Sequence, residues 1–191
     1  MLEYGRKIKG SGCVKAQEFL KLLEDKNIDI DDLSQLVVSA LNKKSLRIAT
    51  AESCTGGMIS SLITDVSGSS SVFDFGVCTY ANHIKHKILG VKDETLNTYG
   101  AVSERTAMEM ARGARILSGA DIAISTTGIA GPLGGSQYKP VGLVYIGIST
   151  ENKLLSHKVL LSEGREPQRR RIRELASACA LYFALMEIDE I

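Results

Sequence analysis

Strand-like and helix-like segments alternate along most of the chain, and no other feature restricts the fold more. The expected strands are short apolar runs at 46–50, 75–80, 121–126, 141–149 and 153–160. The expected helices cover 57–64, 84–89, 103–117 and 168–186. Strands interleaved with helices predict an α/β fold with helices on both faces of one sheet. Because only the polar turn 150–152 separates the last two strands, we expect a hairpin there, and thus a three-layer αβα domain with a mixed, largely parallel sheet.

The first 44 residues follow a different pattern, that of two amphipathic helices. Apolar residues recur at helical spacing in the second of them, at positions Leu33, Leu36, Val37, Ala40 and Leu41. Asp31 and Asp32 are expected to start this helix, because carboxylates favour its positive end. We therefore divide the chain into an N-terminal helical extension, 1–44, and a main domain, 45–191. An apolar extension suits a subunit contact, so we expect a homo-oligomer.

Composition and charge argue against several classes of function. The 23 basic and 22 acidic side chains leave a net charge of +1, so no strong field would attract nucleic acid or an anionic membrane. No apolar run approaches the roughly 18 residues that a membrane span needs, and no signal-peptide pattern follows the basic N-terminus. We therefore expect a cytoplasmic protein without a membrane or nucleic-acid partner. The basic cluster Arg169-Arg170-Arg171 and Arg173 is expected to be a solvated helix start, because glutamates flank it.

Cysteine and histidine spacing gives no pattern typical of a metal site. The four cysteines are widely separated, without a Cys-x-x-Cys pair, and predict reduced thiols. His83 and His86 lie three positions apart on an expected helix, where a metal-binding pair is the alternative to a solvated face. Because no third ligand is in view, we expect no metal ion.

The segment 50–57, TAESCTGG, joins an expected strand to an expected helix. Its glycines tolerate positive φ, and the following helix start offers unpaired N–H groups. Such a turn can bind phosphate, or hold the oxyanion formed when a nucleophile in the turn attacks a substrate. Ser53 and Cys54 are the two candidate nucleophiles. A plain strand–turn–helix connection with small residues for packing is the alternative.

A nucleophilic serine needs a base, and the sequence offers a lysine for that role. There is no Gly-x-Ser-x-Gly elbow, and no histidine is placed to serve. Lys85, in TYANHIKHKILGV, is the candidate, because burial can lower the pKa of a lysine toward neutrality. Lys87 is expected to point elsewhere on the same helix. An ordinary surface lysine is the alternative for both.

The segment 126–145, TTGIAGPLGGSQYKPVGLVY, is a glycine-rich loop between expected strands. The amides of Gly128, Gly131, Gly134 and Gly135 can form a concave anion site. Thr127 and Ser136 add hydroxyls, and Lys139 adds a positive charge. A plain connecting loop is the alternative, although loops of this kind are often functional.

Four stretches of the chain together resemble the CinA C-terminal-domain family, which includes stand-alone nicotinamide mononucleotide deamidases. They are TAESCTGG, VSGSSSVFDFGVCTYANHIKHKILGV, GAVSERTAMEMARGAR and TGIAGPLGGSQYKPVG. They follow one another between residues 46 and 148 with family-like spacing. The resemblance implies an amidohydrolase that converts nicotinamide mononucleotide to nicotinate mononucleotide and ammonia. It implies a small-molecule nucleotide as partner and no cofactor.

The resemblance also implies roles for single residues. Ser53 matches the nucleophile of the family, Lys85 its base, and Tyr80 a site tyrosine. The implied substrate-binding residues are Glu52, Thr55, Gly56, Gly57, Thr127, Gly128, Ala130, Gly131, Lys139 and Arg165. Amides at 55–57 would hold the oxyanion. Arg165 would contact the phosphate, although it follows Ser162-Glu163-Gly164 where the family usually has Gly-Asp.

Two other readings of the same residues stay open. The chain can be a non-catalytic nucleotide-binding regulatory module of the CinA family, because motifs can outlive an activity. Alternatively, Cys54 can be the nucleophile if the turn supplies the positive environment that a thiolate needs.

Overall fold

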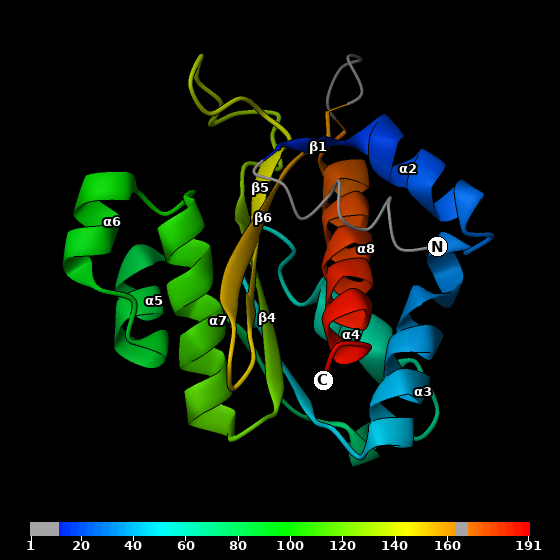
Figure 1. Cartoon of the computed structure of the whole chain (residues 1–191). Helices are drawn as coiled ribbons and strands as arrows, with labels where there is room; N and C mark the ends of the chain where they lie inside the picture. Colours follow the sequence, from blue (N-terminus) through cyan, green and yellow to red (C-terminus); the bar gives the residue numbers. More distant parts are fainter. Residues whose placement is uncertain (1–11, 163–167) are drawn as a thin grey trace.

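Parallel and antiparallel strands share one six-stranded sheet in the computed structural model, which describes residues 12–162 and 168–191 (Figure 1). The strands are β1 (Val14–Lys15), β2 (Ile48–Glu52), β3 (Phe73–Cys78), β4 (Ile122–Gly128), β5 (Leu143–Ser149) and β6 (Leu154–Leu160), in the order β1-β6-β5-β4-β2-β3. β2 runs parallel to β3 and β4, and β1 runs parallel to β6. β5 is antiparallel to both neighbours. The mixed, largely parallel sheet and the hairpin of the prediction are confirmed.

Helices cover both faces of this sheet, which gives the predicted three layers (Figure 1). One layer holds α5 (Asn82–Leu89), α6 (Asp93–Tyr99) and α7 (Glu104–Ser118). The other holds α2 (Ala16–Asp25), α3 (Leu33–Lys44), α4 (Met58–Thr64) and α8 (Arg169–Ile188). As predicted, Ser103 caps α7, and its side chain accepts a hydrogen bond from the Thr106 amide at 3.2 Å. The sequence patterns did not predict β1, α6 or the 3₁₀ turns Ile30–Asp32 and Ser69–Ser71.

The N-terminal helices belong to the same hydrophobic core as α8 and the sheet. Phe19 and Leu33 are fully buried, and the Phe19 ring packs edge-on against Tyr182 of α8, with ring centroids 5.8 Å apart. Asp29 caps the 3₁₀ turn before α3 by accepting from the Asp31 amide, and Asp32 makes no side-chain cap. Most of the apolar face on which the expected homo-oligomer rested is therefore buried within the chain.

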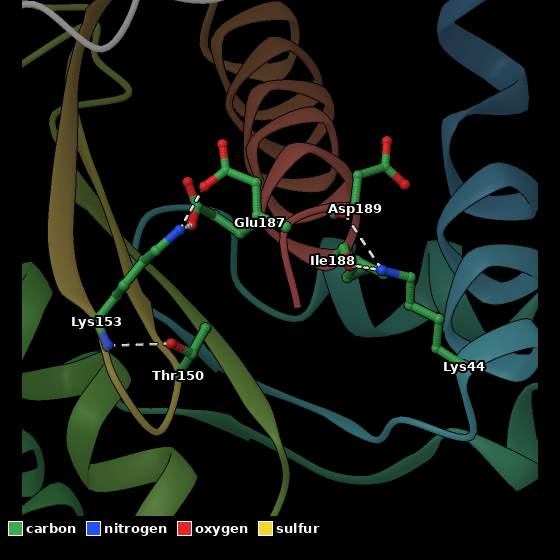
Figure 2. Close-up of polar contacts among 7 residues, drawn as sticks. Lys44, Thr150, Lys153, Glu187, Ile188 and Asp189 are labelled. Carbon is green, nitrogen blue, oxygen red and sulfur yellow. Dashed lines mark hydrogen bonds and ion pairs between the residues drawn. The ribbon is translucent and has the colours of Figure 1, made fainter.

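Two lysines fix the C-terminal end of α8 (Figure 2). Lys44 Nζ donates to the carbonyl oxygens of Ile188 at 2.8 Å and Asp189 at 3.3 Å. Lys153 Nζ pairs with Glu187 at 2.9 Å and also with Glu190. Cations near a helix C-terminus satisfy its free carbonyl groups and oppose its dipole. The anchored helix carries arginines at its other end, beside the candidate site.

Candidate active site

A pocket of about 200 Å³ lies at the edge of the sheet where β2 and β4 end. Because β2, β3 and β4 are mutually parallel, the loops after them meet at this edge, where α/β folds commonly bind ligands. The pocket is lined by Ser53, Cys54, Tyr80, Lys85, Ala101, Val102, Thr127, Gly128, Ala130 and Arg169. Several residues expected in the site are thus brought together from segments far apart in the sequence.

Ser53 and Lys85 are in direct contact in this pocket. Lys85 Nζ lies 3.0 Å from Ser53 Oγ and donates to the carbonyl oxygens of Thr79 at 2.7 Å and Tyr80 at 3.1 Å. The Lys85 side chain is only 1% exposed, and burial lowers the pKa of its amine to about 8. The neutral amine can keep two hydrogens on the carbonyl groups and turn its lone pair toward Ser53. This arrangement is typical of a serine with an amine as its base.

Helix periodicity explains why Lys85 faces inward. α5 begins directly after β3 and the short segment 79–81, and the buried residues of α5 are Lys85 and Leu89, four positions apart. Lys87 is exposed, as predicted. His86 lies near Asp93, and its ring nitrogen is 2.8 Å from the Val91 carbonyl oxygen, outside the pocket. Among residues 12–162 and 168–191, no group of three or more His, Cys, Asp or Glu side chains is placed to hold a metal ion.

Glu52 organises the turn after β2 from within. Its fully buried carboxylate accepts hydrogen bonds from the amides of Gly57 (2.9 Å), Ile59 (3.1 Å) and Ser60 (2.8 Å), and from the Ser60 hydroxyl (2.7 Å). A carboxylate at the start of α4 is stabilised by the free amides and positive end of the helix. Glu52 therefore binds the protein itself, whereas the resemblance implied a substrate contact.

The turn after Ser53 leaves backbone amides without acceptors. Gly56 and Gly57 have φ values of +61° and +92°, and the Met58 amide donates to the Thr55 carbonyl oxygen at 3.4 Å, as in a tight turn. Because Glu52 occupies the Gly57 amide, that amide is not free for an oxyanion. Within the described residues, the amides of Cys54, Thr55 and Gly56 donate no hydrogen bond. The free donors therefore start one residue earlier than the sequence suggested.

The glycine-rich loop contributes only part of what was expected. Gly128 and Ala130 line the pocket, as does Thr127, whose hydroxyl donates to the Ala101 carbonyl oxygen at 2.7 Å. Lys139 Nζ donates to the Tyr99 carbonyl oxygen at 2.7 Å, and Lys139 is not among the lining residues. Arg165 lies outside the described residues.

Thr55 and Gly131, which the resemblance implied as substrate-binding residues, form hydrogen bonds within the protein. The buried hydroxyl of Thr55 lies 2.7 Å from that of Thr126. The carbonyl oxygen of Gly131 accepts a hydrogen bond from Arg169 at 2.8 Å.

Two arginines of α8 contact residues of the site, and the sequence patterns did not predict these contacts. Arg169 lines the pocket and donates to the Tyr80 hydroxyl at 3.0 Å. The Tyr80 side chain is exposed, and the hydrogen bond between Tyr80 and Lys85 is made by the Tyr80 backbone carbonyl oxygen. Arg173, half-buried, donates to the Thr55 carbonyl oxygen. Arg169 is exposed, as expected for a solvated helix start, but it and the half-buried Arg173 also make contacts at the site, whereas Arg170 pairs with Glu174. The spacing of four residues was the available signal, because it puts 169 and 173 on one helix face.

Cys54 does not have the surroundings of a reactive thiol. It is 6% exposed, and burial raises the pKa of its thiol to about 12. Activated cysteines instead have a lowered pKa and an accessible sulfur. The geometry favours Ser53 as the nucleophile.

The part of the chain that the structure describes has no helix long and apolar enough to cross a membrane.

Comparison with known proteins identifies relatives over most of the chain. The family model described as CinA C-terminal domain matches residues 30–187. A putative competence-damage inducible protein of Caldanaerobacter subterraneus is 51% identical over 144 residues, which cover 75% of this chain and 35% of the relative. One of Caldicellulosiruptor saccharolyticus is 53% identical over 154 residues, 81% of this chain and 36% of the relative. The chain thus spans about a third of the length of these curated relatives.

Solved structures of similar proteins have the same fold. The competence/damage inducible protein CihA from Agrobacterium tumefaciens is 42% identical, with a TM-score of 0.79, over 84% of this chain and 95% of that protein. A CinA superfamily protein from Klebsiella pneumoniae is 29% identical, with a TM-score of 0.80, over 85% of this chain and 99% of that protein. Sequence and structure agree, and this chain belongs to the CinA C-terminal domain family.

Proposed function

We propose that the chain is an amidohydrolase that converts nicotinamide mononucleotide to nicotinate mononucleotide and ammonia through a Ser53–Lys85 dyad. The observation that carries the proposal is the buried Lys85 Nζ, 3.0 Å from Ser53 Oγ, with the pKa of its amine lowered to about 8. An amine of this pKa is a suitable general base near neutral pH. The choice of amide substrate rests on the family resemblance.

The two side chains and the turn between them supply each step of amide hydrolysis. Ser53 Oγ attacks the carboxamide carbon while Lys85 Nζ takes the hydroxyl proton. The negative oxygen is held by the free amides of residues 54–56, at about 3 kcal/mol for each effective donor. The carbon–nitrogen bond then breaks, and Lys85 returns the proton to the departing ammonia. Lys85 next takes a proton from a water, which attacks the acyl-serine. Lys85 returns that proton to Ser53 Oγ as the carboxylate product leaves.

Charge around the pocket favours an anionic substrate. Arg169 lines the pocket, and within residues 12–162 and 168–191 its guanidinium bonds only neutral oxygens, those of Gly131 and Tyr80. Glu52, the acidic residue of the turn, is fully buried and surrounded by N–H and O–H donors. A phosphate beside Arg169 would gain charge-assisted hydrogen bonds. Arg169 is therefore our first candidate for the phosphate contact, and Arg165 is the second.

A nucleotide-binding regulatory module is the second candidate function. The position of Arg169 at the pocket favours it equally, because phosphate binding needs no turnover. The two functions differ in what they require of Lys85: the amidohydrolase needs its neutral amine, whereas the module needs only the pocket.

The test compares three potential substrates: nicotinamide mononucleotide, nicotinamide riboside and nicotinamide. In H₂¹⁸O, the amidohydrolase should release nicotinate mononucleotide with one ¹⁸O in the carboxylate, detected by mass spectrometry. The two compounds without phosphate should react at least roughly tenfold more slowly, in line with one lost charge-assisted contact. Calorimetric binding of the nucleotide with no product would support the regulatory module. If the protein neither binds the nucleotide nor turns it over, both proposed functions are refuted.

A further inference from the structure

The side chain of Arg173 in α8 binds the backbone of the turn that follows Ser53. Its Nε and Nη2 atoms donate to the same Thr55 carbonyl oxygen, at 3.2 and 2.6 Å. The two residues are 118 positions apart, so α8 ties the nucleophile turn to the far end of the chain. Arg173 is half-buried and is not among the residues that line the pocket. Its role must therefore act through the turn.

The bond to Thr55 has a geometric consequence for Gly56. The Thr55 carbonyl and the Gly56 N–H belong to one planar trans peptide, in which they point in opposite directions. Fixing the oxygen therefore fixes the direction of the N–H. Gly56 has φ of +61° and no side chain, so the other restraint on this peptide is the long 3.4 Å hydrogen bond from the Met58 amide to the Thr55 oxygen. Arg173 Nη2 would lie 3.3 Å from a Cβ at Gly56, which shows how closely the guanidinium packs against the turn.

The next peptide is fixed independently. The Gly57 amide donates to the Glu52 carboxylate at 2.9 Å, so Glu52 restrains the peptide after Gly56 and Arg173 the peptide before it. Between these two restraints, the Gly56 amide has no acceptor in the described part of the chain. A polar group held in place without a partner is suited to bind a charge that develops during a reaction.

We infer that Arg173 is a positioning residue, which orients the Gly56 amide as a donor to the oxyanion. The inference rests on the proposed Ser53 chemistry but not on the identity of the amide substrate. A fluorophosphonate probe separates the two questions. Ser53 Oγ would attack phosphorus, the P–F bond would break to release fluoride, and Lys85 would take the hydroxyl proton. The phosphoryl oxygen would occupy the place of the oxyanion.

The experiment measures the second-order rate of Ser53 labelling in wild type, Arg173→Met, Arg173→Lys and Arg170→Met. Arg170 is the matched control, because it lies on the same helix and, in the part of the chain that the structure describes, pairs with Glu174 and not with the turn. Labelling should fall by about tenfold to hundredfold in Arg173→Met, as expected for a misplaced reacting group. Arg173→Lys should recover part of the rate, and Arg170→Met should stay within about twofold of wild type. Hydrogen exchange of the peptide 53–58 should accelerate in Arg173→Met alone.

Steady-state kinetics with nicotinamide mononucleotide, on variants whose folded fractions are matched by circular dichroism, add a second readout. We expect kcat to fall with the labelling rate while KM changes less than about threefold, because Arg173 does not line the pocket. An unchanged labelling rate in Arg173→Met, or no labelling of wild type, would overturn the inference. Arg173-dependent labelling without ammonia release would support it and would refute only the proposed substrate.

Discussion

Lys85 Nζ lies 3.0 Å from Ser53 Oγ, and two backbone carbonyl oxygens hold the amine on its other sides. The two residues follow different strands, β2 and β3, whose parallel pairing brings the loops after them to one edge of the sheet. The contact is thus a product of sheet topology.

Activity should depend on pH through the Lys85 amine. Because the pKa of this amine is lowered to about 8, the base is largely protonated below that pH and largely neutral above it. We expect kcat/KM to rise about tenfold per pH unit below 8 and to level off above it. Rates measured from pH 6 to 10 on folded enzyme would check this. A flat profile between pH 6 and 8 would contradict a lysine base.

The free energy of unfolding should also depend on pH through the Lys85 amine. The amine has a lower pKa in the folded chain, about 8, than its ordinary value of 10.5, so between these values the unfolded chain binds more protons. Stability of wild type relative to Lys85→Met should therefore rise with pH from about 8 to 10.5, by at most about 3 kcal/mol in total. Urea unfolding at several pH values measures the difference, and a constant difference would refute a buried amine of lowered pKa.

Glu52→Gln should damage both stability and the nucleophile turn. Four donors surround the Glu52 carboxylate, and a glutamine amide group would face at least one of them with its own N–H. We expect the free energy of unfolding to fall by roughly 2 kcal/mol or more. Glu151→Gln, in the exposed turn between β5 and β6, is the control and should be nearly neutral. Equal stability of the two variants would mean that Glu52 does not organise the turn.

Cys54→Ala should keep the activity. Burial raises the pKa of the Cys54 thiol to about 12, so the thiolate is scarce at neutral pH. We expect kcat within about threefold of wild type and a stability loss of about 1 kcal/mol from the small cavity. Iodoacetamide should modify the exposed Cys78 well before Cys54. A loss of activity above a hundredfold in folded Cys54→Ala would favour the thiol as the nucleophile.

Most of the fold could be predicted from the sequence, because period and turn residues report directly on local structure. The alternation of apolar runs predicted β2 to β6, and the Ser103 pattern predicted the start of α7. β1 has two residues and α6 seven, too few for a period to be visible. The N-terminal helices were expected to face another subunit, because an amphipathic pattern shows that a face is buried but does not show by what.

The candidate site was predictable only in part, for a related reason. Ser53 and Lys85 stand in motifs that resemble a known family, and the structure brings them together. Arg169 and Arg173 stand in a basic, glutamate-flanked run that is typical of a solvated helix start. Their contacts with Tyr80 and Thr55 join residues 89 and 118 positions apart. Such contacts depend on where α8 packs, which no local pattern reports.

The most direct test of the Ser53–Lys85 dyad is ammonia release from nicotinamide mononucleotide by wild type, Ser53→Ala and Lys85→Ala, with the folding of each checked by circular dichroism. The proposed dyad predicts turnover by wild type and a loss of about a thousandfold or more in both folded variants, because the nucleophile and its base act as one unit. Turnover by folded Lys85→Ala or Ser53→Ala at a rate close to that of wild type would contradict it. So would a folded wild type that releases no ammonia between pH 7 and 9.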